Sequence, residues 1–236
     1  MKLAAIMPTY NQADFLVEAI ESVRSQVDLL VVVDDASTDG TWEILNARYR
    51  TELRMDYVLL PQNRGAAGAI NAGAQRIRTA HAARPEWLTW VSSDNVAHPD
   101  WAESLLECAV SGVGMVYSGY NARGDIAPHY NFRPYDPAAL GSSIACYIGP
   151  SFIIRADCWP DHRGRHCHDY DHFLRVEEAC WEKGLRVVGL DRPLYTYRVH
   201  RGMATRNHRA GDFDATHWLR EAQARRKAAG IVPPAA

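Results

Sequence analysis

A chain of 236 residues is long enough to bury the core of one large α/β domain or of two small ones. Its 26 basic and 28 acidic side chains nearly cancel, which argues against binding through bulk charge, and we expect no nucleic-acid partner. No apolar run reaches the roughly 18 residues that a membrane span needs. The five cysteines form no CxxC pair, so we expect a protein without a transmembrane segment in the reducing cytoplasm.

The first hundred residues alternate apolar strands with amphipathic helices. The expected strands are 2–7, 29–33, 55–60 and 88–91, and the expected helices are 14–26, 41–49 and 66–82. Such an alternation with short connections predicts a mostly parallel sheet covered by helices on both faces. Ligands of these sheets bind beyond the carboxyl ends of the strands. The polar clusters that follow the four strands should therefore meet on one rim.

Beyond about residue 112 the pattern is less regular. We expect strands at 113–118, 148–155, 186–190 and 194–199, a helix from about residue 170, and a C-terminal helix at 216–230. Residues 124–140 contain three prolines and predict a loop-rich excursion. The basic residues of the C-terminal helix predict a solvated face. Neither a repeat nor a low-complexity linker divides the chain, so one continuous domain is expected.

Two of the polar clusters carry carboxylates. Asp34 and Asp35 are adjacent at a strand end, where each needs a partner to offset its charge. The 87–91 segment leads into Ser92, Ser93, Asp94 and Asn95. Residues of these types favour turns, which is one interpretation of both clusters. The other interpretation is a set of carboxylates held at the edge of a sheet to bind a charged ligand.

Four segments of the chain resemble those of a known family, and this resemblance favours the interpretation as a ligand-binding site. In order and spacing, residues 8–26, 31–45, 62–77 and 90–95 resemble the nucleotide-sugar half of family 2 glycosyltransferases, whose fold is called GT-A. The resemblance covers residues 3 to about 100 and resumes at 168–171 and 197–200. It implies an α/β fold with a single GT-A domain over residues 1–236, a mostly parallel Rossmann-like sheet, and a C-terminal helix and flap. Residues 1–100 would bind the nucleotide-sugar, 101–215 would bind the acceptor and catalyse, and 216–236 would form a helix and tail.

The resemblance also implies a donor site. Pro8, Thr9 and Tyr10 would line the base and ribose pocket, and the Asp35 carboxylate would accept a base N–H. An arginine often precedes the helix asparagine in the family, but Ile70 stands there in this chain. The full implied donor set is Pro8, Thr9, Tyr10, Asp34, Asp35, Asn63, Arg64, Gly65, Asn71, Ser93 and Asp94.

By the same resemblance, Asp94 matches the metal-binding carboxylate of a DxD-like motif, and Ser92 replaces the first acid. Mn²⁺ or Mg²⁺ would suit such oxygen ligands together with donor phosphates. His200 is the expected second ligand, although a strand-end histidine bonded to backbone is an alternative. The arginines near the predicted flap are expected to neutralise the leaving diphosphate, and they are Arg198, Arg201 and Arg206.

The segment 162–175 admits two interpretations. Zinc would use residues among His162, His166, Cys167, His168 and His172, but their spacing lacks the paired pattern of known zinc sites. The resemblance instead matches Asp169 to an acidic motif in which His168 replaces the usual glutamate. Asp169 would then be the general base that deprotonates the acceptor hydroxyl, with inversion at the anomeric carbon. A helix N-cap is the structural alternative for Asp169.

We therefore predict a metal-assisted, inverting, hexosyltransferase-type glycosyltransferase of polysaccharide biosynthesis. Its donor would be a UDP-sugar or a dTDP-sugar, and its acceptor a glycan, a lipid-linked molecule or a small molecule. A homodimer is compatible with this prediction. Two alternatives stay open: a non-catalytic nucleotide-sugar-binding protein, suggested by Ser92 and His168, and a nucleotidyltransferase. The latter needs a glycine- and arginine-rich loop after the first strand, which residues 8–15 do not supply.

Overall fold

The computed structural model describes residues 1–137, 148–164, 168–201, 203 and 216–232. Its strands are β1 (Leu3–Thr9), β2 (Leu29–Asp34), β3 (Met55–Leu59), β4 (Trp87–Trp90), β5 (Val96–Ala97), β6 (Val113–Gly124), β7 (His129–Asn131), β8 (Phe152–Arg155) and β9 (Arg186–Val199). Its helices are α1 (Ala13–Val23), α2 (Thr41–Tyr49), α3 (Gly65–Ala80), α4 (Trp101–Glu107), α6 (His168–Glu182) and α7 (Thr216–Ala229), with a 3₁₀ turn at Ala156–Cys158.

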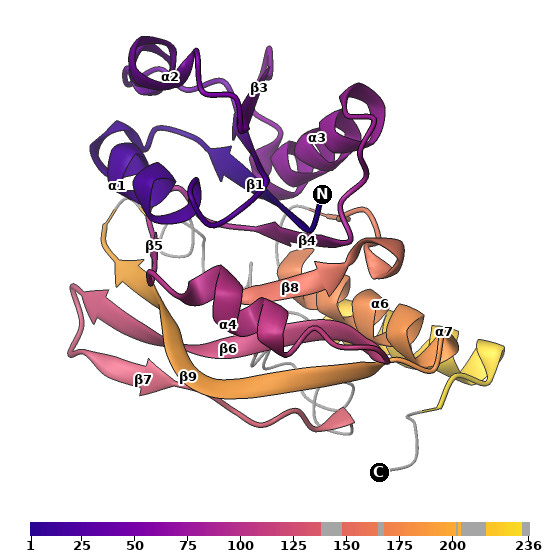
Figure 1. Cartoon of the computed structure of the whole chain (residues 1–236). Coiled ribbons are helices and arrows are strands. Elements are labelled where there is room, and N and C mark those ends of the chain that lie inside the picture. The colour runs from indigo at the N-terminus through magenta and orange to yellow at the C-terminus, as the bar shows by residue number, and fades with distance from the viewer. Residues whose placement is uncertain (138–147, 165–167, 202, 204–215, 233–236) are drawn as a thin grey trace.

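The strands of the described ranges form one nine-stranded sheet in the order β3-β2-β1-β4-β8-β6-β9-β5, with β7 paired to β6. Strands β1, β2, β3, β4, β6 and β9 run in the same direction, while β8, β7 and β5 run against their neighbours. Figure 1 shows the sheet curling from β3 at one end of the molecule to β9 at the other. The predicted mostly parallel α/β sheet is confirmed.

Helices cover both faces of the sheet. Successive side chains of a strand point to opposite faces, so in β1 the residues Leu3, Ala5 and Met7 pack with α1, whereas Ala4 and Ile6 belong to the core under α3 and α6. The helices α1, α2 and α4 share the first core, and α3, α6 and α7 share the second. This division confirms the expected covering of the sheet on two sides.

Close packing of α3 on β1 depends on one glycine. A Cβ atom at Gly73 would lie 2.4 Å from Cγ2 of Ile6 and 3.1 Å from Cγ2 of Val33. Only glycine allows the helix backbone to approach the strands so closely. As a result, the start of α3 is held beside the carboxyl ends of β1 and β2.

Several boundaries differ from the sequence-based expectations. The short elements α4, β5 and β7 were not predicted, and the first helix ends at Val23 rather than near residue 26. Strand β9 is continuous where two strands were expected, because register shifts against β6 near Gly119 accommodate Pro193. The 124–140 excursion contains β7, and its last residues lie outside the described ranges. Within the described ranges, no helix combines the length and apolar character that crossing a membrane requires.

Candidate functional site

The carboxyl ends of β1, β2 and β4 form one rim of the sheet, and β5 adds the end of β9 to it. Thr9 lies opposite Asp34 in the β1–β2 register, and the N–H of Asp35 donates to the Thr9 carbonyl at 2.9 Å. Strand β5 pairs Val96 with Thr196 and Ala97 with Tyr195. This pairing places the segment after β4 alongside the last residues of β9 (Figure 1). The predicted clusters therefore meet at one edge.

The Thr9 and Tyr10 side chains differ in their exposure at this rim. Thr9 is buried, and its hydroxyl has no hydrogen-bond partner among the residues that the structure describes. Tyr10 directly after it is 46% exposed, so its ring is open to solvent. Pro8 is half-buried beside them. An exposed aromatic side chain at this rim suits contact with a planar ligand.

Asp35 has a structural role that the sequence analysis did not assign. Its two carboxylate oxygens accept the backbone N–H groups of Arg64 at 2.7 Å and of Gly65 at 2.8 Å. These are free N–H groups at the start of α3, so a carboxylate from β2 caps that helix. Gly65 has a φ of +74°, which favours glycine. The Asn63 amide donates to the Asp35 carbonyl at 3.3 Å and closes the same turn.

The adjacent carboxylates Asp34 and Asp35 are both buried. Burial raises the pKa of Asp35, and the charge of Asp34 raises it further, while the two N–H donors of the α3 start oppose both effects. Asp34 accepts the backbone N–H of Ser37 at 3.1 Å. Each carboxylate therefore has the partner that a buried charge requires.

Asn71 connects α3 to a distant segment instead of pointing to open space. Its side-chain carbonyl accepts the N–H of His162 at 2.7 Å, and its amide group donates to the His162 carbonyl at 2.9 Å. Both ends of the amide are engaged in this exchange. In the structure Asn71 is therefore a tether for the segment before α6, whereas the sequence analysis placed it among the donor contacts. Ile70 beside it is buried in the core.

Asp94 and His200, the two residues expected to share an ion, lie side by side. Oδ2 of Asp94 is 3.1 Å from Nε2 of His200. Their side chains are 16% and 18% exposed, so both are accessible from solvent. Ser93 is buried next to them, and the Asn95 side-chain carbonyl accepts the backbone N–H of Arg198 at 2.9 Å. That bond and the β5–β9 pairing hold the two chain segments together.

This pair fits a divalent cation with two protein ligands. A carboxylate oxygen and an imidazole nitrogen already converge, and Mg²⁺ or Mn²⁺ is commonly bound by one or two protein groups that leave positions for substrate phosphates. Among the residues the structure describes, no group of three or more His, Cys, Asp and Glu side chains could hold a metal ion. The remaining ligands would therefore have to come from the bound nucleotide and water.

Of the predicted diphosphate arginines, Arg198 lies differently from expectation. Its guanidinium is 2.5 Å from the Glu18 carboxylate and 5.5 Å from the centroid of the Phe15 ring, both on α1. An opposite charge and an aromatic face direct it to α1 rather than toward a diphosphate. Arg201 is exposed just after β9, and Arg206 lies outside the described residues.

Asp169 is an exposed residue in the first turn of α6. Its Oδ1 accepts the N–H of Tyr170 at 2.9 Å, a local contact of the kind found at helix starts. The other acid of this motif, Asp171, is fully buried and binds Arg163 at 2.7 Å and Arg175 at 2.8 Å. Burial alone would raise the pKa of Asp171, but these two guanidiniums outweigh it and hold the pKa below its usual range. Asp171 therefore anchors α6, and Asp169 is the accessible carboxylate.

The zinc interpretation is not supported by the part of the segment that the structure describes. The imidazoles of His162 and His172 stack face to face, with centroids 3.9 Å apart and planes 8° from parallel. Stacked rings do not aim their nitrogens at a common point. His166, Cys167 and the side chain of His168 lie outside the described residues.

An aromatic cluster joins the end of β4 to α6. The Trp90 ring contacts Phe152 at 4.3 Å and His162 at 4.7 Å between centroids, and it stacks on Phe173 at 5.4 Å. Trp159 packs against the same ring at 5.7 Å. The cluster fixes the first turns of α6 beside the segment that carries Asp94. Its residues come from four separated parts of the chain, so their spacing in the sequence gives no signal.

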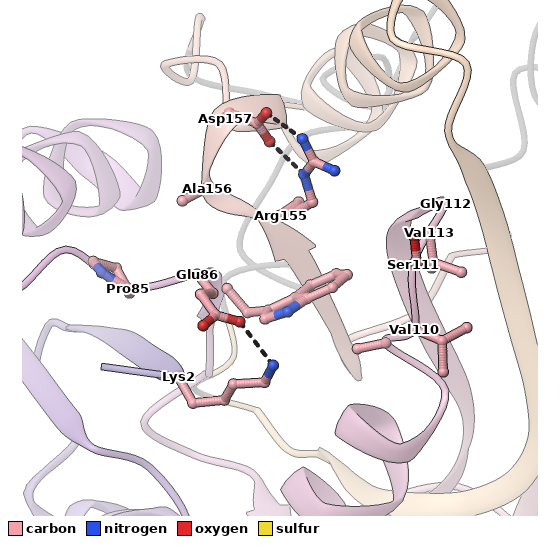
Figure 2. Close-up of a pocket in the computed structure, with 12 residues that line it drawn as sticks. Lys2, Pro85, Glu86, Val110, Ser111, Gly112, Val113, Arg155, Ala156 and Asp157 are labelled. Carbon is pink, nitrogen blue, oxygen red and sulfur yellow. Dashed lines mark hydrogen bonds and ion pairs between the residues drawn. The ribbon is translucent and has the colours of Figure 1, made fainter.

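A pocket of about 500 Å³ lies elsewhere, at the opposite end of the parallel strands (Figure 2). It is lined by the starts of β1, β4 and β6 and by the end of β8. Figure 2 shows its charged side chains already paired, Lys2 with Glu86 at 2.7 Å and Arg155 with Asp157. This pocket is thus separate from the rim that carries Asp94.

Comparison with known proteins agrees with this arrangement. The family model described as Glycosyl transferase family 2 matches residues 4–158, which include β1 to β8. The chain therefore belongs to glycosyl transferase family 2 and contains a glycosyltransferase domain. The match covers the segments after β1, β2 and β4, which form the rim described above.

Several known members of this family are similar in sequence to part of this chain. A putative teichuronic acid biosynthesis glycosyltransferase, TuaG of Bacillus subtilis, is 31% identical over 157 residues, or 61% of this chain and 59% of its own length. The poly(ribitol-phosphate) beta-N-acetylglucosaminyltransferase TarS of Staphylococcus aureus is 30% identical over 173 residues, 68% of this chain and 29% of its own. The chain thus spans less than two thirds of the length of these relatives.

Solved structures support the fold. A crystal structure of S. aureus TarS residues 1–349 in complex with UDP-GlcNAc has a TM-score of 0.69 at 18% identity and covers 95% of this chain and 66% of that one. The mannosyltransferase PcManGT of Pyrobaculum calidifontis, in complex with GDP-Man and Mn²⁺, has a TM-score of 0.61 at 17% identity and covers 98% of this chain and 76% of that one. These likenesses confirm the GT-A fold.

Proposed function

We propose that this chain transfers a sugar from a nucleotide-diphosphate sugar to an acceptor hydroxyl, with inversion and with the help of Mn²⁺ or Mg²⁺. The observation that carries the proposal is the Asp94–His200 pair, 3.1 Å apart on the same rim as Asp34, Asp35 and Tyr10. A UDP-sugar is the leading donor, since TarS, which has the same fold, was crystallised with UDP-GlcNAc. A dTDP-sugar is the second choice.

In this scheme the donor lies along the rim. The exposed ring of Tyr10 stacks on the base. Asp35 already accepts two N–H groups, so it contacts the base through its remaining lone pairs. Arg64 and Asn63 stand at the turn that Asp35 closes, where ribose and phosphate oxygens would find donors.

The reaction needs a leaving group with its charge neutralised and an acceptor with its proton removed. Asp94 and His200 would hold the cation, which would supply positive charge to stabilise the departing diphosphate. Asp169 is exposed at the start of α6 and removes the acceptor proton as the oxygen attacks the anomeric carbon. Arg201 is exposed after the end of β9 and would add positive charge there. Attack from the side opposite the leaving group inverts the anomeric centre.

The acceptor is proposed only as a class. One relative named above is described as a putative glycosyltransferase of teichuronic acid biosynthesis and the other as a poly(ribitol-phosphate) beta-N-acetylglucosaminyltransferase, which supports a glycan or lipid-linked hydroxyl. Chondroitin synthase of Pasteurella multocida, 28% identical over 201 residues, points to the same kind of acceptor. The division of the chain at residues 100 and 215, a cytoplasmic location and a homodimer stay predictions.

The test is a screen of nucleotide-sugars for Mn²⁺-dependent release of the nucleoside diphosphate, with the wild type beside Asp94→Ala. We expect release with one donor, at least a hundredfold weaker in Asp94→Ala, and recovered by Mn²⁺ after treatment with a chelator. Tight binding of a nucleotide-sugar without metal-dependent turnover of any donor would favour the non-catalytic binder, the alternative that Ser92 in place of an acid suggests.

A further inference from the structure

One side of α1 lies against the end of β9. The Phe15 ring contacts the His200 imidazole, with centroids 4.5 Å apart and planes tilted by 40°. The same ring lies 5.5 Å below the guanidinium of Arg198. Arg198 and His200, on either side of the last residue of β9, therefore both contact the Phe15 ring of α1. None of the predicted donor or catalytic residues belongs to α1.

The contact of Arg198 with α1 is fixed from three directions. Its guanidinium is 2.5 Å from Glu18, and Glu18 follows Phe15 by three positions, so both residues occupy one face of the helix. Its backbone N–H is held by Asn95 at 2.9 Å. The Arg198 side chain is only 14% exposed, whereas Glu18 is 60% exposed. Because the Glu18 carboxylate is largely in solvent, the ion pair adds little to the free energy of folding, but it sets the direction of the Arg198 guanidinium.

His200 has few other means of orientation. It follows the last residue of the β6–β9 ladder, and its backbone carbonyl accepts the N–H of Met203 at 3.3 Å. Its Nε2 lies against Asp94, and its ring contacts the Phe15 ring at a tilt. An imidazole with one polar contact and one ring contact is oriented by the two together, in the way that the surroundings of a metal ligand fix its ring.

We propose that Phe15 is a positioning residue for His200. The contacts of Arg198 with Glu18 and Phe15 hold the end of β9 against α1. Phe15 keeps Nε2 of His200 directed at Asp94 and so sets the geometry of the cation pair. The role in cation binding rests on the proposed function. The orientation of His200 by Phe15 does not, because both contacts are present in the protein alone.

Two readouts test this inference. The first is the ¹⁵N NMR signal of the His200 imidazole in metal-free protein, which reports the hydrogen bond at Nε2. The second is the Kd of Mn²⁺ in the presence of UDP. For Phe15→Ala we expect loss of the hydrogen-bonded signal and a Kd about tenfold higher, the effect typical of groups that orient a metal ligand. High Mn²⁺ should restore transfer by Phe15→Ala but not by Asp94→Ala.

Matched variants separate orientation from general loss of packing. Phe15→Tyr keeps the ring and should stay within twofold of the wild type. Phe15→Leu keeps apolar bulk, protects the fold and should still raise the Kd about threefold. Val17→Ala removes bulk from the same helix two positions along, on a different face, and should change neither readout.

The outcomes are distinguishable. An unchanged His200 signal in folded Phe15→Ala or Phe15→Leu would overturn the positioning role, whatever the metal does. A changed signal with a Kd within twofold of the wild type would overturn its link to the cation. A wild type that binds no Mn²⁺ with UDP would instead contradict the proposed function, while the NMR comparison would still decide the role of Phe15.

Discussion

Asp94 and His200 are 106 positions apart in the chain and 3.1 Å apart in the structure. The sequence indicated each residue separately, because Asp94 ends a strand motif and His200 follows another. Their approach depends on β5, a two-residue strand with no periodicity to predict it. The direction of Arg198 was equally hidden, since its partners Glu18 and Phe15 lie on a helix that precedes it by some 180 positions.

At the same scale, Asp169 is expected to be essential for transfer and dispensable for donor binding. Asp169→Asn should abolish transfer to the acceptor, because an amide cannot take the proton, and should leave the Kd of the nucleotide within twofold. Transfer and equilibrium binding are measured on the same preparation. Asp161→Asn, an exposed acid of the segment before α6, is the control. Turnover of Asp169→Asn within tenfold of the wild type would refute the assignment as base.

At the scale of elements, the sequence predicted most long helices and strands because apolar periodicity marks them. It missed α4, whose seven residues are too few for a helical pattern to stand out. It divided β9 at Asp191–Pro193, since proline interrupts a strand signal and only the neighbouring strand shows that the ladder continues. The cap of α3 was also hidden, because its carboxylate comes from β2 and not from the residues before the helix.

The α3 cap gives a prediction of stability. Asp35→Ala leaves the backbone N–H groups of Arg64 and Gly65 at the start of α3 without their carboxylate acceptor, so the free energy of unfolding should fall by about 1–2 kcal/mol. Chemical denaturation of the nucleotide-free protein measures it. Asp14→Ala, an exposed acid in the first turn of α1, should cost less than about 0.5 kcal/mol. Equal losses for the two variants would show that Asp35 does not stabilise α3.

Helix α7 is held on α6 by a polar network that includes two of its four basic residues, Arg225 and Arg226, whereas Arg220 and Lys227 are exposed as expected of a solvated face. Arg226 lies 2.7 Å from Glu177, Arg225 lies 3.1 Å from Glu178, and the Arg226 guanidinium stacks 4.7 Å from the Trp181 centroid. The Tyr135 hydroxyl donates to Glu177 at 2.6 Å. Burial raises the pKa of Glu177 to about 7, although Arg226 and Tyr135 oppose that rise.

This pKa predicts how stability depends on pH. Because the folded-state pKa of Glu177 is above its unfolded value, the stabilisation linked to its proton is present below pH 4.5 and is lost as the pH rises through 7. The unfolding free energy of the wild type relative to Glu177→Gln should therefore fall by about 2–3 kcal/mol between pH 4.5 and 8. A difference that is constant over this interval would mean that Arg226 keeps Glu177 ionised throughout.

For the whole molecule, the sheet separates two ends with different properties. The carboxyl ends of β1, β2 and β4 carry the acidic and aromatic side chains, and the end of β9 joins them through β5. The opposite end holds a pocket whose charged groups neutralise one another (Figure 2). The two cores on either side of the sheet hold this geometry, with α1 supporting His200 on one face and α6 presenting Asp169 on the other.

In the proposed function, Asp94 and His200 share one divalent cation on the diphosphate of a bound donor. A crystal soaked with UDP and Mn²⁺ tests it most directly, because the anomalous signal of manganese locates the ion. We expect one peak within coordination distance of Oδ2 of Asp94, Nε2 of His200 and the oxygens of both phosphates. Bound UDP with no manganese peak at this pair, or with the ion held by other residues, would contradict the account.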